Sequence, residues 1–176
     1  MTKNMLSKLK IISLIGRSGS GKTNLIINAI KRLRKELHYN IAVIKNIHEH
    51  QIDEEGKDSY RYIEAGANYA ITKNIYNETT LFVKKEINFS QLINWISSGP
   101  FKIDLIFTEG FRTLNHPTIL CVKEFNEIES QLTKNVKMIS GLITKEDISN
   151  ITEFKLPIID IEKDFVKFLN IFDIKQ

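Results

Sequence analysis

Short runs of apolar, often β-branched residues alternate along this chain with longer stretches in which apolar residues recur every three to four positions. The first pattern is typical of buried strands and the second of amphipathic helices. Their alternation predicts an α/β fold with a mostly parallel central sheet, because helices then connect successive parallel strands. The expected strands are Lys10–Ile15, Ile41–Lys45, Asn68–Thr72, Thr80–Val83, Ile103–Thr108, Thr118–Lys123, Val136–Ile143 and Pro157–Asp160. The expected helices are Gly21–Leu37, Ser59–Ala65, Ser90–Ser97 and Ile161–Phe172.

The longest expected helix, Gly21–Leu37, has one apolar face and one basic face. It carries the densest cluster of positive charge in the chain, Lys31-Arg32-Leu33-Arg34-Lys35. We interpret this cluster as a solvent-exposed face, with binding to an acidic partner or to nucleic acid as the alternative. The chain has a net charge of only +4 and no basic motif interleaved with aromatic residues, so we expect no nucleic-acid partner.

The strongest candidate for chemistry is the segment G-R-S-G-S-G-K-T, which matches the phosphate-binding loop pattern and lies between an expected strand and an expected helix. Its glycines let backbone N–H groups point at phosphate oxygens, and the helix that follows presents its positive end to the same anion. We expect Lys22 to reach the β- and γ-phosphates and the Thr23 hydroxyl to hold magnesium. The loop predicts a three-layer fold of the P-loop NTPase type that binds a nucleoside di- or triphosphate. The expected phosphate-binding residues are Gly16, Arg17, Ser18, Gly19, Ser20, Gly21, Lys22 and Thr23.

A carboxylate at the end of another expected strand is the second candidate. In an open parallel sheet, ligands bind beyond the carboxyl ends of the strands. Glu109 directly follows the expected strand Ile103–Thr108 and should face the phosphates, whereas Asp104 lies at the opposite end. We therefore predict that Glu109 acts near the magnesium ion or the attacking water, with an exposed turn carboxylate as the alternative.

The segment after the expected strand Ile41–Lys45 contains two histidines and several carboxylates. We predict that Asp53 is a second carboxylate on the magnesium side. The pattern His48-x-His50 with Asp53 could instead indicate a transition-metal site, although tight sites of that kind usually offer four well-spaced ligands. The pair Asp58-Ser59 is typical of a helix N-cap, which gives both residues a structural role.

Length and composition place limits on these predictions. With 176 residues, 42% of them hydrophobic and 26% charged, the chain is expected to form one globular domain over residues 1–176. The single cysteine, Cys121, lies in an apolar run, which predicts a buried thiol and excludes an intrachain disulfide. No apolar stretch approaches a membrane span or a signal-peptide core, so we expect a cytoplasmic protein without a membrane partner.

Three segments, taken together, resemble the family of molybdopterin-guanine dinucleotide biosynthesis protein B (MobB), which belongs to the P-loop GTPases. They are G-R-S-G-S-G-K-T, then I-K-N-I-H-E-H with D-E-E-G-K-D-S and E-A-G-A, then L-I-F-T-E-G-F-R; a weaker continuation follows at Leu156–Asp160. The chain departs from the family pattern at Asn46 and at Glu54–Gly56.

This resemblance implies binding of GTP and Mg²⁺, slow GTP hydrolysis and a homodimer. It also implies an accessory role beside the guanylyltransferase that attaches GMP to molybdopterin, and beside other proteins of molybdenum cofactor assembly. By motif position it makes Gly16–Thr23 the phosphate-binding loop, Asp53 a magnesium-side carboxylate and Glu109 the acid of the second motif.

A four-residue segment bears on the choice of base. Thr144-Lys145-Glu146-Asp147 follows the apolar run Met138–Ile143, where GTPases of this class often carry Asn-Lys-x-Asp. We predict that Asp147 accepts hydrogen bonds from guanine and that the stem of Lys145 covers the ring. Thr144 departs from the pattern, and a charged loop without a role is the alternative.

The predicted reaction is hydrolysis of GTP at its γ-phosphate, with Lys22 and the loop N–H groups stabilising developing charge and Glu109 acting near the water or metal. Arg17, Lys57 and Arg112 lie on expected loops at the ligand end, and we hypothesise that one or more contacts a second anion or an acidic partner. Two alternatives stay open: a nucleotide-dependent adaptor in which hydrolysis is incidental, and a small-molecule kinase. An arginine-bearing lid, which such kinases usually have, is poorly supported by the five arginines of this chain.

Overall fold

The structure, a computed structural model, describes residues 9–145 and 155–175. These residues form two compact units. The first unit contains the described residues up to 46 and those from 96 onward, and the second contains residues 47–95. The expectation of one domain over residues 1–176 stays a prediction.

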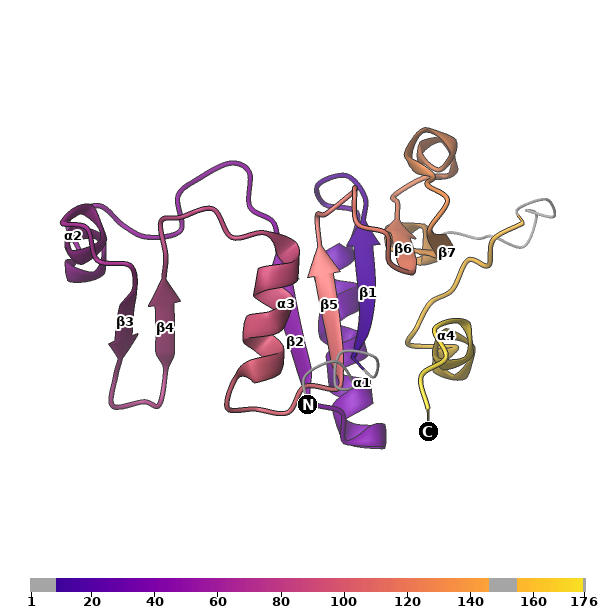
Figure 1. Cartoon of the computed structure of the whole chain (residues 1–176). Coiled ribbons are helices and arrows are strands. Elements are labelled where there is room, and N and C mark those ends of the chain that lie inside the picture. Colours follow the sequence, from indigo (N-terminus) through magenta and orange to yellow (C-terminus); the bar gives the residue numbers. More distant parts are fainter. Residues whose placement is uncertain (1–8, 146–154, 176) are drawn as a thin grey trace. The chain divides into compact units, whose positions relative to one another are not determined.

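The first unit is built on a five-stranded sheet in which every pairing is parallel (Figure 1). The strand order is β2-β5-β1-β6-β7. This arrangement confirms the predicted α/β fold class, and it brings the carboxyl ends of all five strands to one edge. The strands are β1 (Lys10–Ile15), β2 (Ile41–Lys45), β5 (Leu105–Glu109), β6 (Thr118–Cys121) and β7 (Val136–Ser140).

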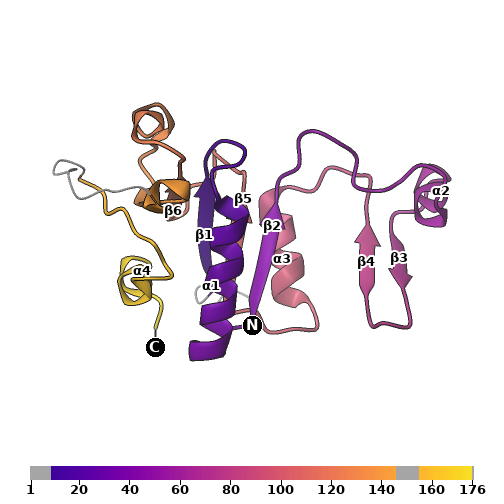
Figure 2. The same ribbon diagram turned by 180° about the vertical axis from the view of Figure 1, so that it is seen from behind.

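The two faces of this sheet carry separate apolar clusters, because successive side chains of a strand alternate between faces. On one face pack α1 (Lys22–Leu37) and α4 (Phe165–Ile171); Figure 2 shows α1 in front of β1. The other face is covered around the short 3₁₀ helices η1 (Phe125–Glu127), η2 (Glu129–Gln131) and η3 (Leu142–Lys145). The first unit therefore has three layers, as expected.

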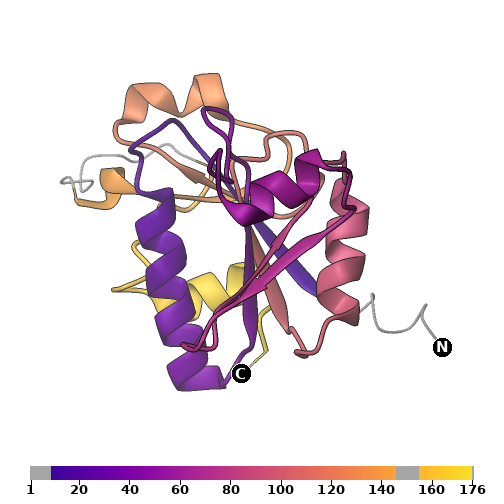
Figure 3. The same cartoon turned by 90° about the vertical axis from the view of Figure 1, so that its left-hand side faces the viewer.

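The C-terminal end of the described chain lies beside the end of α1 (Figure 3). The Tyr39 hydroxyl, just beyond α1, donates a hydrogen bond of 3.2 Å to the Lys175 carbonyl. At the start of β1, Lys10 Nζ donates to the carbonyls of Phe172 and Asp173. These contacts hold the C-terminal segment at the edge of the sheet that lies opposite the ligand edge.

The second unit contains α2 (Asp58–Glu64) and a hairpin of β3 (Ala70–Lys73) and β4 (Thr79–Phe82). The two strands pair antiparallel in a sheet of their own, so the strands expected here exist but do not extend the parallel sheet. The helix α3 (Phe89–Ser98) follows, and the boundary between the units falls within it.

Three sequence-based boundaries are wrong. The apolar run Val136–Ile143 is not one strand, because the chain turns after Ser140 and continues as η3. The expected helix Ile161–Phe172 begins late, after Asp164, whose carboxylate caps α4 by accepting from the Lys167 N–H at 3.2 Å. The expected strand Pro157–Asp160 contributes only one parallel bridge, between Ile158 and Ile139.

The predicted N-cap at Asp58-Ser59 is also wrong. The N-cap position of α2 is Lys57, which makes no side-chain capping bond. The Ser59 hydroxyl instead donates to Asp53 at 3.1 Å, so it ties the preceding loop to the helix.

Candidate functional site

The glycine-rich loop joins the carboxyl end of β1 to the start of α1, and it crosses the end of β6 closely. Gly16 adopts a φ of +146°, and a Cβ at this position would lie 2.1 Å from the Cys121 carbonyl oxygen. Only glycine fits both the backbone conformation and this approach. Glycine at position 16 therefore lets the loop pass close to the backbone of Cys121 at the end of β6.

Ser20, a residue of the glycine-rich loop, is buried, with only 1% of its surface exposed. Its backbone carbonyl accepts from the Leu142 N–H at 3.2 Å, which links the loop to the segment after β7. Its hydroxyl oxygen has no hydrogen-bond partner among the residues that the structure describes. A buried hydroxyl of this kind normally finds a partner, so Ser20 is an exception within the loop.

Lys22 and the start of α1 concentrate positive charge at this loop. Lys22 Nζ donates to the carbonyls of Gly16 at 3.1 Å and Arg17 at 2.8 Å, so the ammonium group lies over the loop. Gly21 is the N-cap of α1, and no side chain of the described residues caps this helix start. The first N–H groups of α1 and its dipole therefore favour an anion here.

Thr23 and Glu109, which sequence analysis assigns to the metal, are in contact. The Thr23 hydroxyl lies 3.2 Å from each carboxylate oxygen of Glu109. Glu109 is the last residue of β5 and is 7% exposed, and Lys45 of β2 lies opposite it in the register. Lys45 Nζ is 3.6 Å from the Glu109 carboxylate and balances its charge. Hydroxyl and carboxylate oxygens are the ligands that magnesium prefers, so this pair fits a divalent cation beside a phosphate.

These residues line one cleft of about 380 Å³, which we call the phosphate cleft. Its floor is the glycine-rich loop, and its walls include the pair Thr23 and Glu109. The predicted residues of the loop and of the metal pair are therefore brought together on one edge of the sheet. The lining residues are Ser18, Gly19, Ser20, Gly21, Lys22, Thr23, Asn24, Lys45, Glu109 and Leu142.

Asp53 lies in the second unit, as do His48 and His50. The Asp53 carboxylate accepts from the Glu54 N–H at 3.0 Å and from the Ser59 hydroxyl, and His50 Nδ1 lies 2.9 Å from the Gln51 carbonyl. Among residues 9–145 and 155–175, no three or more histidine, cysteine, aspartate or glutamate side chains form a group that could hold a metal ion. The magnesium-side role of Asp53 stays a prediction.

The three cationic residues suggested for a second anion each have a local partner. Arg17 pairs with Glu127 at 3.5 Å, and Arg112 donates to Gln131 at 2.9 Å. In the second unit, Lys57 pairs with Glu54 at 2.7 Å, and this hydrogen bond raises the pKa of Lys57. The hypothesis of a second anion stays untested.

The segment predicted to read the base is described only in part. Thr144 and Lys145 lie in η3, where the Thr144 hydroxyl donates to the Gly141 carbonyl at 2.9 Å. Lys145 lines a cleft next to the phosphate cleft. Asp147 lies outside the described residues.

The Cys121 thiol is fully buried, as the apolar run around it predicts. Burial raises its pKa to about 12. The thiol is therefore protonated near neutral pH and acts as a small apolar side chain in the core.

The comparison with protein families shows which family carries this fold and these motifs. The model of Molybdopterin guanine dinucleotide synthesis protein B, MobB, matches residues 11–145. This chain belongs to the MobB family. The family resemblance of the sequence motifs is thereby confirmed, and the match includes the loop at Gly16–Thr23 and Glu109.

Two similar proteins carry descriptions that agree with this family. A Haemophilus influenzae protein described as a molybdopterin-guanine dinucleotide biosynthesis adapter protein is 34% identical over 122 residues, which cover 66% of this chain and 65% of that protein. A Methanocaldococcus jannaschii relative is 33% identical over 121 residues, covering 66% of this chain and 48% of that one. The match therefore spans less than two thirds of either relative.

Solved MobB structures share the fold. The crystal structure of Bacillus subtilis MobB superposes with a TM-score of 0.72 and 22% identity, covering 94% of this chain and 99% of that one. A MobB homologue from Bacillus stearothermophilus gives a TM-score of 0.63 and 16% identity, and the superposition covers 91% of this chain and 94% of that one. At these identities the likeness supports the fold alone. In the part of the chain that the structure describes, no helix is both long and apolar enough to cross a membrane.

Within this MobB-family site, sequence analysis missed Lys45 and Lys123. Lys45 comes to Glu109 through strand pairing, which the sequence does not display. Lys123 Nζ lies 3.3 Å from the position that a Cβ on Gly19 would take, and its backbone N–H donates to Glu127 at 2.9 Å. The signal for Lys123 was its place directly after the apolar run of β6, where a side chain faces the ligand edge.

Proposed function

We propose that this chain is a GTP-binding adapter in molybdopterin guanine dinucleotide biosynthesis and hydrolyses GTP slowly with magnesium. The observation that carries the nucleotide part is the contact between Thr23 and Glu109 at the mouth of the glycine-rich loop. The description of the family and of the Haemophilus influenzae relative supports the adapter part.

The loop N–H groups and Lys22 would bind the β- and γ-phosphates, because they combine fixed dipoles with a positive charge. Thr23 and Glu109 would hold the magnesium ion, which neutralises charge on the phosphates. In hydrolysis, water attacks the γ-phosphorus and the bond to the β–γ bridging oxygen breaks, which yields GDP and phosphate. Glu109, which lines the phosphate cleft, would orient the water or hold the metal.

Turnover is expected to be slow because none of the described residues that line the phosphate cleft is an arginine. Arg17 pairs with Glu127, and Arg112 donates to Gln131. Without an arginine finger, a related GTPase turns over at roughly 10⁻⁴ s⁻¹, whereas one with an arginine in cis reaches roughly 10⁻² s⁻¹. A partner protein that supplied or released an arginine would accelerate the reaction.

The proposal includes a homodimer in the cytoplasm whose partner is the guanylyltransferase that attaches GMP to molybdopterin, with other cofactor-assembly proteins as further partners. Membership of the MobB family favours this interpretation over a small-molecule kinase. Sedimentation equilibrium tests the dimer.

Calorimetric titration with GTP and then ATP, each with magnesium, tests nucleotide binding. We expect Lys22→Ala to abolish tight triphosphate binding, because the ammonium over the loop is lost. Lys35→Ala is the matched control, since Lys35 is an exposed lysine in the last turn of the same helix. If Lys22→Ala bound GTP as tightly as the wild type, the assignment of the phosphate site would be contradicted. A preference of the wild type for ATP would favour the kinase interpretation.

A further inference from the structure

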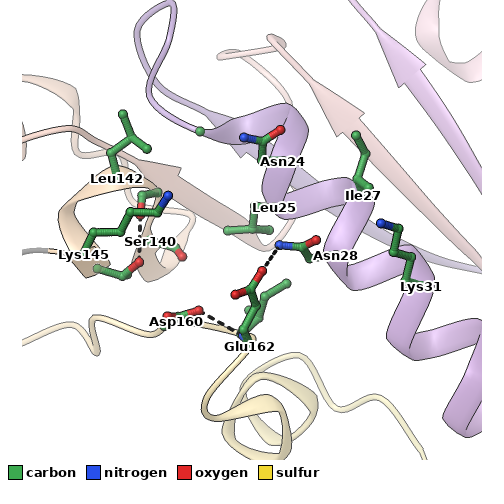
Figure 4. Close-up of a pocket in the computed structure, with 14 residues that line it drawn as sticks. Asn24, Leu25, Ile27, Asn28, Lys31, Ser140, Leu142, Lys145, Asp160 and Glu162 are labelled. Atoms are coloured by element: carbon green, nitrogen blue, oxygen red, sulfur yellow. Dashed lines mark hydrogen bonds between the residues drawn. The ribbon is translucent and has the colours of Figure 1, made fainter.

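A second cleft of about 360 Å³ adjoins the phosphate cleft in the first unit (Figure 4). Its volume falls within the roughly 300–1,000 Å³ that small-molecule sites occupy. Gly21, Asn24 and Leu142 line both clefts, so the two are adjacent. A ligand with its phosphates on the loop would extend into this second cleft, which we call the nucleoside cleft.

The walls of the nucleoside cleft suit a flat, polar ring. Figure 4 shows Leu142 and Lys145, from the segment after β7, across the cleft from Asn24 and Asn28 of α1. Leu142 and the Lys145 stem can cover the face of a ring, and the amides offer donors and acceptors to its edge. A nucleoside base is the part of a nucleotide that has this chemistry.

Backbone pairing with β7, at the outer edge of the sheet, places the Asp160 carboxylate at this cleft. The Ile139 N–H donates to the Pro157 carbonyl, and the Ile159 N–H donates to the Ile139 carbonyl, each at 2.9 Å. The chain before Asp160 therefore runs parallel beside β7. Asp160 comes directly after this segment, so it lies at the carboxyl-end edge where ligands bind.

The Asp160 carboxylate is held in place with acceptor capacity left over. Its Oδ1 accepts from the Glu162 N–H at 3.0 Å. Its Oδ2 lies 3.9 Å from Lys163, whose side chain is 78% exposed and so contributes little. The Glu162 carboxylate differs, because Asn28 already donates to it (Figure 4). Among the described residues that line this cleft, Asp160 is the carboxylate best placed to accept a ligand's hydrogen bonds.

We propose that Asp160 selects guanine nucleotides by accepting hydrogen bonds from the N1–H and exocyclic N2–H groups of the base. The inference rests on the proposed function, because it places the base of a nucleotide whose phosphates lie on the loop. Adenine carries an acceptor at N1, so its ring nitrogen would face the carboxylate and leave the charge unpaired. Asp160 thus takes the role that sequence analysis assigned to Asp147.

The test is Asp160→Asn, titrated with GTP, with xanthosine triphosphate (XTP) and with inorganic tripolyphosphate, all with magnesium. Xanthine carries a carbonyl where guanine carries its amino group, so an asparagine amide can donate where the carboxylate accepted. We expect GTP affinity to fall by about tenfold or more and XTP affinity to rise by a similar factor. Tripolyphosphate has no base, so its affinity should stay unchanged. Asparagine keeps the Oδ1 that accepts from Glu162, which preserves the local fold.

Two matched variants separate the outcomes. Asp173→Asn is the control, because Asp173 is exposed and lies at the opposite edge of the sheet, beside Lys10. Asp147→Asn tests the competing interpretation. A GTP-to-XTP switch in Asp147→Asn but not in Asp160→Asn would overturn the inference, and so would an Asp160→Asn variant that loses all three ligands equally. Wild-type protein that binds tripolyphosphate without preferring GTP to ATP would also overturn it, while leaving the phosphate loop intact. If neither GTP nor tripolyphosphate bound, the proposed function itself would fail.

Discussion

The contact between Thr23 and Glu109 combines a hydroxyl and a nearly buried carboxylate at the mouth of the phosphate cleft. Without a cation, that carboxylate would repel the phosphates of a nucleotide; under the proposed function it would become a ligand when magnesium is bound. Its charge therefore has opposite effects on nucleotide affinity in the two conditions.

This reversal predicts the behaviour of Glu109→Gln, which keeps the shape of the side chain and an oxygen for Thr23. In EDTA, GTP affinity should be equal to or greater than that of the wild type, and the gain on adding magnesium should shrink by roughly tenfold. Calorimetry across a magnesium series measures both. Glu129→Gln, an exposed glutamate of the same unit, is the control. An unaltered magnesium gain in Glu109→Gln would take Glu109 out of the metal site.

Gly16 and Gly19 both have positive φ in the same loop, yet they differ in what surrounds them. A Cβ on Gly16 would meet a backbone carbonyl at 2.1 Å, whereas a Cβ on Gly19 would meet the flexible tip of Lys123 at 3.3 Å. We expect Gly16→Ala to lower the free energy of unfolding by roughly 3 kcal/mol or more, and Gly19→Ala by about 1 kcal/mol. Urea denaturation followed by circular dichroism measures both values. Equal losses would mean that the approach to Cys121 does not constrain the loop.

At the scale of elements, the basic cluster on α1 has a role that sequence analysis did not predict. The Arg32 guanidinium lies 4.1 Å from the centroid of the Phe165 ring of α4. It also donates to the Ile161 carbonyl at 3.0 Å and to Glu36 at 2.7 Å. One residue of the cluster therefore joins α1 to the C-terminal segment, instead of facing only solvent.

Arg32→Lys should lower the free energy of unfolding by about 1–2 kcal/mol, because an ammonium group cannot stack on the ring and reach both acceptors at once. Arg34→Lys is the matched control, since Arg34 is an exposed arginine of the same helix. The measurement is urea denaturation at moderate salt. A loss of the same size in both variants would show that the Phe165 and Ile161 contacts contribute nothing specific.

The helices and strands also differ in how well the sequence predicts their boundaries. The pattern predicted β1, β2 and all of α1, with one extra residue at the start of the helix, because each has a clear period and a strong boundary signal. The expected strand extended past the end of β7, because Leu142 and Ile143 resume the apolar pattern after Ser140 and Gly141. The strand ends at Ser140, and the Leu142 N–H bonds to the carbonyl of Ser20, a residue more than a hundred positions earlier. The residues of the candidate site likewise fall into those that local patterns predict and those that depend on long-range contacts.

A local motif identified Lys22 and Thr23, and the rule for strand ends identified Glu109. Lys45 depends on strand register, and Asp160 depends on a bridge to β7, so neither position could be derived from neighbouring residues. Contacts distant in sequence therefore complete a site that local patterns begin.

At the scale of the whole molecule, the question is whether hydrolysis or only nucleotide binding serves the proposed partner. Guanylyl transfer breaks the bond between the α- and β-phosphates, whereas the hydrolysis proposed for this chain breaks the bond between β and γ. A GTP analogue with an imido group between the β- and γ-phosphates therefore still donates GMP and cannot be hydrolysed by this chain. It separates the two uses of nucleotide in a single assay.

We expect this chain to stimulate the guanylyltransferase as strongly with the imido analogue as with GTP. The roles proposed for Lys22, Thr23 and Glu109 require a bound triphosphate but not its cleavage, and the hydrolysis proposed for this chain is slow. Lys22→Ala should remove the stimulation, and Lys35→Ala should retain it. Stimulation with GTP but not with the analogue would make hydrolysis a required step, and the partner would then have to supply or release the missing arginine.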